Sequence, residues 1–296
     1  MKALVVGWFS FEKMGATAGD LLVRDSVCEW LRRTNYSYDV ALAKPFIGGV
    51  NWQSVDPAGY SHVIFVCGPF GNGWPISDFL SRFAGRKLIG VNLTMLDSLE
   101  TWNPFELLIE RDSSRTSRPD MAFLSRQCKV PVVGVVLIHP QPEYRDRDLH
   151  ESANDAIHRL VASREMSPVR IDTRLDRNST ELRTPAEVES LIARMDVVLT
   201  TRLHGMVLAL KNDVPAVVID PVAGGAKIRK QADALGWSPV FIADQLNDDE
   251  MQKAFEDCLS AEARRKACEC RQRAQRILAP VADQFIAGLA GEIVRA

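Results

Sequence analysis

The sequence predicts an α/β protein built from parallel sheets. Short apolar runs rich in β-branched residues recur along the chain, which is typical of buried strands. Helical patterns fall between several of these runs, as in strand–helix–strand units. The length of 296 residues suits two domains of roughly 100–200 residues each. The predicted strands are Ala3–Val6, Val40–Ala43, Val63–Cys67, Leu88–Asn92, Leu107–Ile109, Val132–Ile138, Val197–Thr200 and Ala216–Asp220.

Two helices have recognisable starts in the sequence. Asp20 is a residue type that caps helices, and the stretch from there to about Arg33 carries an apolar helical face. Thr184 and Pro185 precede a second helix, with Glu187 in capping-box spacing. Each predicted helix lies between two predicted strands, so the connections fit parallel strand–helix–strand units.

A change of composition marks the domain junction. The segment between Glu110 and Lys129 is polar and basic and contains proline, as linkers between domains do. The C-terminal part has a helical pattern broken at Ser260 and Pro280, so we expect three helices there. The predicted parts are an N-terminal domain over 1–120, a second domain over 130–245 and a C-terminal helical segment over 246–296.

Composition and charge exclude several classes of protein. Lysine and arginine number 36 against 38 aspartates and glutamates, so no overall field favours nucleic acid or anionic lipid. No apolar stretch is long enough to predict a transmembrane segment. The six cysteines are scattered without a CxxC pair or a Cys/His cluster at zinc spacing. We therefore expect a cytoplasmic protein without a metal and without a nucleic-acid partner.

Ligands of open α/β sheets bind at the carboxyl ends of the strands, and two glycine-rich loops lie at such ends in the N-terminal half. Gly19 and Asp20 begin the first helix after the first strand, where backbone N–H groups could hold an anion or a sugar hydroxyl. Gly68 follows the third strand and permits a ligand to approach the backbone. Both loops are equally compatible with ordinary turns.

The strongest candidate site follows the strand Val197–Leu199. Arg202 and His204 come at the strand end and in the first turn of the next helix, outside its apolar stripe. Arginine presents a planar fork of donors that suits carboxylate or phosphate, and a histidine there can transfer a proton near neutral pH. The alternative is a surface ion pair for the arginine and a histidine hydrogen-bonded to its own loop.

A second candidate for anion binding follows the strand Ala216–Asp220. Gly224 and Gly225 form a turn, and Lys227 begins the next helix. Backbone N–H groups of such a turn can cradle a phosphate, with the lysine as a point charge. A lysine at the start of a surface helix is also common without any ligand.

These residues carry a family resemblance. The run TPAEVESLIARMDVVLTTRLHGMVLALKNDVPAVVIDPVAGGAK, residues 184–227, resembles the C-terminal signature of the polysaccharide pyruvyl transferase family. The helix start at Gly19-Asp20, the glycine-rich loop after Val66 and the pair Arg111-Asp112 are similar to weaker family features in the same order. The resemblance implies two Rossmann-like domains that face each other across a cleft, as in GT-B glycosyltransferases.

The resemblance also implies an activity and its residues. The activity is transfer of the pyruvyl group of phosphoenolpyruvate (PEP) onto two sugar hydroxyls as a cyclic ketal, with release of phosphate, in polysaccharide biosynthesis. Arg202 would hold the donor's carboxylate or phosphate, His204 would act as acid and base, Lys227 would neutralise phosphate, and Arg111 would lie near the cleft. His139 stands where many members of the family have arginine.

The implied partners are PEP, which binds the second domain, and a sugar or other polyhydroxylated acceptor, which the N-terminal domain would take. No cofactor is implied, because a histidine beside anion clamps can support ketal formation without one. The chain is also a candidate for forming a homo-oligomer.

Two other functions fit the same residues. The first is a GT-B-type glycosyltransferase that uses a nucleotide sugar, with Asp220, Asp244 or Trp237 contacting the ribose or the base. The second is a non-catalytic binding module that kept the family's fold. Stabilisation by PEP or by nucleotides in a thermal shift would discriminate between the first alternative and the pyruvyl transferase.

Overall fold

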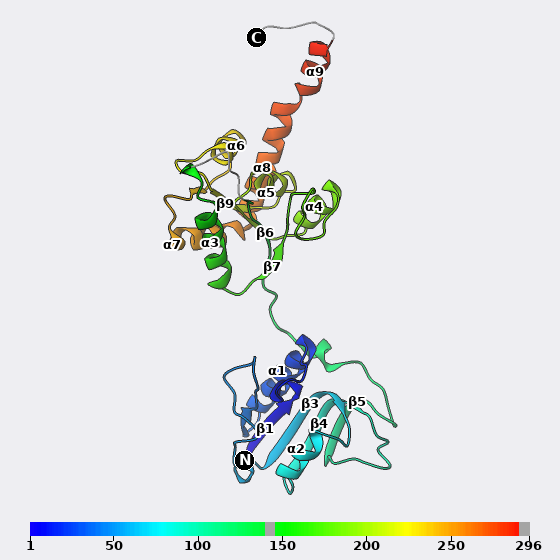
Figure 1. The fold of residues 1–296 in the computed structure, drawn as a ribbon. Coiled ribbons are helices and arrows are strands. Elements are labelled where there is room, and N and C mark those ends of the chain that lie inside the picture. The colour runs from blue at the N-terminus through cyan, green and yellow to red at the C-terminus, as the bar shows by residue number, and fades with distance from the viewer. Residues whose placement is uncertain (140–145, 290–296) are drawn as a thin grey trace. The chain divides into compact units, whose positions relative to one another are not determined.

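The computed structural model describes residues 1–139 and 146–289. The chain divides into two compact units, Met1–Cys128 and Lys129–Ala296, which we call the N-terminal and C-terminal units. Each unit contains a five-stranded sheet whose neighbouring strands are parallel (Figure 1). The predicted fold class, α/β with two parallel sheets, is confirmed.

The N-terminal unit has the strand order β2-β1-β3-β4-β5. Its strands are β1 (Lys2–Gly7), β2 (Ser37–Val40), β3 (His62–Phe70), β4 (Lys87–Met95) and β5 (Leu107–Asp112). Its helices are η1 (Trp8–Ser10), α1 (Ala18–Arg32), η2 (Pro57–Gly59), α2 (Ile76–Arg82) and η3 (Met121–Leu124). One face of the sheet packs against α1, and the other packs against α2 through an aromatic-rich core.

The C-terminal unit has the strand order β7-β6-β8-β9-β10. Its strands are β6 (Val132–Val136), β7 (Ser167–Arg170), β8 (Val197–Thr200), β9 (Ala216–Asp220) and β10 (Val240–Ile242). Its helices are α3 (His150–Ala162), α4 (Pro185–Ile192), α5 (Leu203–Lys211), α6 (Lys227–Leu235), α7 (Asp248–Cys258), α8 (Ala261–Leu278) and α9 (Val281–Leu289). This order repeats that of the N-terminal unit strand for strand.

The shared order is that of a doubly wound sheet, and it fixes where a ligand is expected. The first strand of each unit lies between the second and the third, so the chain reverses its direction of travel between the first and third strands. Crevices open outside the carboxyl ends of the strands at such a switch point. The switch points are β1/β3 in the N-terminal unit and β6/β8 in the C-terminal unit.

The first helix starts one turn earlier than we expected. The N-cap of α1 is Thr17, and Asp20 is the third helical residue. The Asp20 carboxylate accepts a 2.7 Å hydrogen bond from the Thr17 N–H, and the Asp20 N–H donates to Thr17 Oγ1 at 3.4 Å. Prediction of Asp20 as the N-cap was therefore wrong, because the pair forms a capping box with the threonine outside. The capping box predicted for Thr184 and Glu187 is confirmed.

Two strands lacked a sequence signal. β7 contains a proline and is mostly exposed, and β10 is an apolar run of only three half-buried residues, which is too short to predict a strand. The strand predicted at Val40–Ala43 is instead β2, which ends at Val40, because Ala41 already forms an isolated bridge to Val50.

The C-terminal helices belong with the second sheet. The three helices expected after residue 246 are α7, α8 and α9, separated at Ser260 and Pro280 as the pattern predicts. Met251 and Phe255 of α7 and Ala267 of α8 are buried in the same core as β6, β8 and β9. These two helices therefore complete the C-terminal unit.

Candidate functional site

The switch point of the C-terminal unit gathers two of the predicted residues. His139 follows β6, and Arg202 lies two residues past β8 as the N-cap of α5. β6 and β8 are hydrogen-bonded neighbours, so both side chains start from the same edge of the sheet. The predicted position of Arg202 at a strand end, with His204 in the first helical turn, is confirmed.

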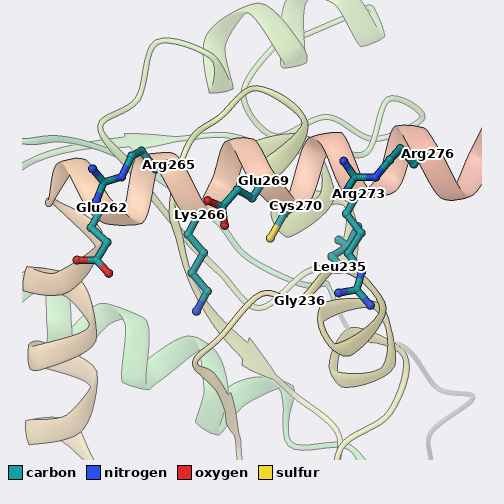
Figure 2. A pocket seen from close by; sticks show the side chains of 9 residues that line it. All are labelled: Leu235, Gly236, Glu262, Arg265, Lys266, Glu269, Cys270, Arg273 and Arg276. Atoms are coloured by element: carbon teal, nitrogen blue, oxygen red, sulfur yellow. The ribbon is translucent and has the colours of Figure 1, made fainter.

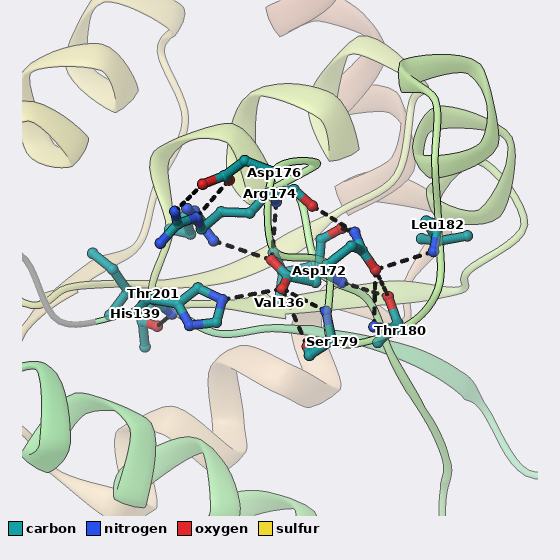
Figure 3. Close-up of polar contacts among 12 residues, drawn as sticks. Val136, His139, Asp172, Arg174, Asp176, Ser179, Thr180, Leu182 and Thr201 are labelled. Carbon is teal, nitrogen blue, oxygen red and sulfur yellow. Dashed lines mark hydrogen bonds and ion pairs between the residues drawn. The ribbon is translucent and has the colours of Figure 1, made fainter.

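Asp172, two residues past β7, joins these side chains into one cluster. His139 Nε2 lies 3.1 Å from Asp172 Oδ2 (Figure 3). Arg202 Nη1 lies 3.3 Å from Asp172 Oδ1. The carboxylate is 3% exposed, and a pocket of about 270 Å³ opens beside it and His139. We call His139, Asp172 and Arg202 the switch-point cluster.

The surroundings of Asp172 keep its carboxylate ionised. Burial by itself raises the pKa of Asp172. The N–H of Arg174 donates to it at 2.9 Å, and the N–H and hydroxyl of Ser179 each donate at 3.1 Å. These bonds, together with His139, outweigh burial and hold the pKa of Asp172 below its ordinary value. The cluster therefore has a fixed negative charge behind Arg202.

Arg202 is held in place but not saturated. Its side chain is 15% exposed, and its backbone N–H donates to Thr200 Oγ1 at 2.9 Å. Burial lowers the pKa of Arg202, while the charge of Asp172 opposes that effect; an arginine remains charged at neutral pH. Within the described part of the chain, Asp172 is the one side chain that accepts from its guanidinium. Donors therefore remain for an anionic ligand.

Two threonines and a glycine fix the start of α5. Thr201 Oγ1 accepts from the Ile138 N–H at 2.9 Å and donates to Asn154 at 2.8 Å, which ties β8 to the segment after β6. A Cβ atom at Gly205 would lie 2.2 Å from Thr200 Oγ1. A larger residue at Gly205 would therefore push the helix, and Arg202 with it, away from the sheet.

His204 projects from the same helix start. It is the second residue of α5 and is exposed, whereas Met206 and Leu210 of the same helix are buried. None of the residues in 1–139 and 146–289 hydrogen-bonds to its ring. The ring is therefore available to a ligand rather than engaged with its own loop.

The glycine loop after β9 is closed by carboxylates of the protein itself. Gly224 and Gly225 both have positive φ, as glycine permits. The Gly224 N–H donates to Asp244 at 3.0 Å, and the Ala226 N–H donates to Asp220 at 2.7 Å. These donors are engaged, so an incoming phosphate would have to replace a carboxylate. Lys227 is the first residue of α6.

The residues that we expected for a nucleotide have structural roles. Asp220 is fully buried and accepts from the N–H groups of Ala226 and Arg229. Trp237 is 3% exposed and donates its indole N–H to the Ala216 carbonyl at 3.0 Å. A ring buried in the core cannot stack on a base. This finding removes Asp220 and Trp237 from the nucleotide-sugar alternative, whereas Asp244 is exposed and accepts one hydrogen bond, from the Gly224 N–H.

Arg111 in the N-terminal unit donates three hydrogen bonds to its neighbours. Its guanidinium donates to Asp112 at 2.9 Å, to Asp120 at 2.7 Å and to Thr94 at 2.5 Å. The first of these bonds lowers the pKa of Asp112 to about 2. Asn92, which is buried and has a φ of 57°, links the same Asp120 to Cys67 through its side-chain amide.

The glycines predicted for ligand approach in this unit differ from each other. A Cβ atom at Gly68, whose φ is +84°, would lie 2.1 Å from the Trp8 ring. The space at Gly68 is thus filled by a tryptophan of the protein. A Cβ atom at Gly19 would meet Thr17 Oγ1 at an ordinary 3.5 Å, so local packing does not require a glycine at that position.

The sequence interpretation missed Asp172, Asn92 and Asp120. Asp172 lies in a polar loop after a strand that has no apolar run, so only its position after Ile171 could have pointed to it. Asn92 and Asp120 act on other side chains rather than through a motif. Each becomes recognisable only when the sheet brings strand ends together.

Other features of the described residues do not form a site of this kind. A groove of about 560 Å³ between α6 and α8 alternates arginine and lysine with Glu262 and Glu269 (Figure 2). Among residues 1–139 and 146–289, no three potential metal ligands lie together. No helix in those ranges is long and apolar enough to cross a membrane.

Comparison with solved structures finds proteins of similar fold. The fold is similar to that of the calicheamicin glycosyltransferase CalG4, at 12% identity and a TM-score of 0.35, covering 99% of both chains. It is also similar to Methanocaldococcus jannaschii UDP-GlcNAc 2-epimerase, at 11% identity and a TM-score of 0.33, covering 94% of this chain and 99% of that one. Scores this low assign no activity. No curated protein matches the sequence.

The fold and the site define a class of two-domain α/β proteins. In this class an arginine and a histidine lie at the carboxyl edge of one sheet. The model of the polysaccharide pyruvyl transferase family matches residues 18–221, which contain the β6/β8 switch point with Asp172, Arg202 and His204. The chain belongs to this family, and the resemblance seen in the sequence is confirmed.

Proposed function

We propose that this protein transfers the pyruvyl group of PEP onto two hydroxyls of a sugar as a cyclic ketal and releases phosphate. Membership of the family supports a transferase. The observation that carries the proposal is the unsaturated guanidinium of Arg202, backed by the buried Asp172 and flanked in sequence by the exposed His204. An anion clamp and a proton donor then come from one helix start.

In this proposal Arg202 binds the carboxylate or phosphate of PEP. Asp172 is a positioning residue, since its carboxylate accepts from one guanidinium nitrogen, Nη1, and leaves the other N–H donors of Arg202 for a ligand. His139 contacts the opposite oxygen of the same carboxylate, so it fixes Asp172 rather than replacing the family's arginine as a clamp.

His204 supplies the proton. Protonation of the PEP methylene carbon yields an oxocarbenium-like carbon, which one sugar hydroxyl attacks as it loses its own proton. The C–O bond to phosphate then breaks, and the second hydroxyl attacks the same carbon to close the ketal. One proton enters the methyl group and two leave the hydroxyls, so the second departs with phosphate. General acid–base catalysis by one group fits this balance without a metal or cofactor.

Phosphate neutralisation is assigned to Lys227 rather than to the glycine loop. The N–H groups of Gly224 and Ala226 already donate to carboxylates of the chain, and Lys227, the first residue of α6, matches the lysine that the family resemblance places after the last strand. Gly224 and Gly225 would then shape the turn that positions Lys227.

The experiment is a phosphate-release assay with PEP labelled at its methylene carbon and a panel of sugars. The expected result is phosphate release that depends on the sugar, together with a labelled ketal methyl signal in the product. PEP should raise the melting temperature, and nucleoside diphosphates should not. Binding of PEP without turnover for any sugar would favour a binding module, and stabilisation by nucleotides alone would overturn the proposal.

A further inference from the structure

The N-terminal unit has a pocket at its own switch point. The pocket has a volume of about 800 Å³ and is lined by the loops that follow β1, β2 and β3, over residues 10–14, 42–53 and 74–78. These loops lie at the carboxyl ends of neighbouring parallel strands, where ligands of doubly wound sheets bind. None of the residues used in the proposed reaction lines it. The pocket is therefore a separate feature that needs its own explanation.

The base of the pocket is rigid. Phe11 and Trp52 are each 6% exposed, and their rings lie 5.2 Å apart. The Arg82 side chain donates to the Trp52 carbonyl at 3.0 Å, which ties the loop after β2 to α2. A Cβ atom at Gly49 would lie 2.4 Å from the Val40 carbonyl, so the loop can turn this closely only with glycine. The site is thus largely preformed, as small-molecule pockets usually are.

The rim combines an exposed aromatic ring with balanced charge. Trp74 is 75% exposed although it lines the pocket. The charged lining residues are Glu12 and Asp78 against Lys13 and Lys44, which cancel. Within the described residues, none of these four side chains has a hydrogen-bond or ion-pair partner. The pocket therefore offers an apolar face together with unengaged donors and acceptors.

We propose that this pocket binds an uncharged sugar ring, with Trp74 as the stacking surface and the carboxylates of Glu12 and Asp78 as acceptors for its hydroxyls. The negative face of an indole attracts the weakly positive C–H groups on one side of a pyranose. Its role as the subsite that holds the acceptor glycan rests on the proposed function; sugar binding itself does not.

The charge of the two switch points separates their ligands. The C-terminal unit presents Arg202 with spare donors, which suits an anion such as PEP. The N-terminal pocket has no net charge, so a strongly anionic ligand would meet Glu12 and Asp78 as well as the two lysines. A purely apolar ligand would leave four charged side chains to be desolvated or displaced. A neutral polyhydroxylated ring fits both the aromatic surface and the polar rim.

Titration with methyl glycosides of glucose, galactose and mannose, without PEP, tests the proposal. Binding is followed by saturation-transfer NMR and by the indole N–H signals of the ¹⁵N-labelled chain. We expect at least one glycoside to shift the Trp74 signal. Trp74→Ala should weaken that binding about tenfold, and Trp74→Phe should weaken it less because a ring remains. Asp78→Asn should weaken it without changing the melting temperature.

Phe123→Ala is the matched control, because Phe123 is 86% exposed in the same unit and does not line the pocket. It should leave glycoside binding unchanged. Absence of binding for all three glycosides up to their solubility, or equal binding by Trp74→Ala and the unchanged chain, would overturn the proposal. Sugar binding without phosphate release from PEP would instead contradict the proposed function and leave this site in place.

Discussion

Arg111 and Arg202 both lie near the carboxyl end of a strand, Arg111 on the edge strand β5 and Arg202 after the switch-point strand β8, but they differ in how fully they are hydrogen-bonded. Each follows or ends a strand at the carboxyl edge of a parallel sheet. Arg111 binds two carboxylates and a hydroxyl. Arg202 binds the buried Asp172, and no other acceptor among the described residues contacts its guanidinium. Asp172 binds one nitrogen of Arg202, whereas the partners of Arg111 take three of its five N–H donors.

This difference teaches that an arginine at a strand end is not by itself evidence of an anion site. Arg202 was a candidate from the strand-end pattern as well as from the family resemblance, and Arg111 from the resemblance alone, and both were expected near the ligand. The number of guanidinium N–H groups left without an acceptor distinguishes the two arginines, because a guanidinium has five N–H groups and a fixed fork geometry. The comparison supports the proposed role of Arg202 in ligand binding and favours a local structural role for Arg111.

The largest expected effect is on the proton donor next to Arg202. His204→Ala should lower turnover by about 10²–10⁴-fold with nearly unchanged PEP affinity, because general acid–base catalysis contributes this much. Steady-state kinetics beside thermal melts make the measurement. His62→Gln, at the start of β3 in the other unit, is the control and should keep full turnover. Full turnover in His204→Ala would remove this histidine from the mechanism.

The second effect tests the comparison directly. Arg202→Ala should weaken PEP binding by roughly 10–100-fold, since hydrogen bonds to charged groups contribute about 1.5–3 kcal/mol. Arg202→Lys should restore little, because an ammonium cannot reproduce a planar fork. Calorimetric titration with PEP measures both. Arg111→Lys is the matched substitution, and an equal loss of PEP affinity there would break the distinction between the two arginines.

The third effect concerns Asp172 and pH. Its pKa is lower in the folded chain than the unfolded value of about 3.9, so its ionised form contributes stability above that pH. That contribution is lost as pH falls through the folded pKa. The free energy of unfolding of Asp172→Asn should therefore fall less steeply with decreasing pH, which flattens the acid limb of its pH profile. The substitution should also raise the KM for PEP more than it lowers kcat. Urea melts between about pH 2 and pH 7 measure the first effect, and an unchanged acid limb would contradict it.

The smallest effect is expected at Arg111. Its side chain is 30% exposed, so solvent weakens its ion pairs, and Arg111→Ala should destabilise the chain by about 1 kcal/mol. PEP affinity should stay the same. The pKa of Asp112 should rise from about 2 toward its ordinary value, because its main partner is removed. NMR titration of the Asp112 carboxyl follows this change, and an unmoved pKa would show that other contacts hold it.

The fold was largely predictable because its strands are buried on both faces and therefore continuous in sequence. β1, β8 and β9 are fully or nearly fully buried runs, and all three were found. β7 and β10 were not, since pairing with a neighbour rather than burial defines an edge strand of three or four residues. Arg202 and His204 were found because they sit beside a regular strand and helix. Asp172 was not, because its importance depends on a loop that returns to the strand end.

The limits of sequence interpretation are clearest at the glycine loop. Gly224, Gly225 and Lys227 match a phosphate-binding pattern, and the backbone does turn there as predicted. The pattern says nothing of which acceptor fills the turn. Asp220 is the last residue of β9, which leads into the loop. Its carboxylate accepts from the N–H groups of Ala226 and Arg229, which the pattern would leave for a ligand.

The separate cores of the two units have a consequence for cooperativity. The aromatic core around Phe65 and Phe79 belongs to the N-terminal unit, and the aliphatic core around Leu199 and Met206 belongs to the C-terminal unit. A chain with two such cores can unfold in two calorimetric transitions rather than one. Each transition then responds to its own ligand. PEP should raise the temperature of the C-terminal transition, and a methyl glycoside should raise that of the N-terminal transition. A single heating scan would therefore measure ligand binding to both units.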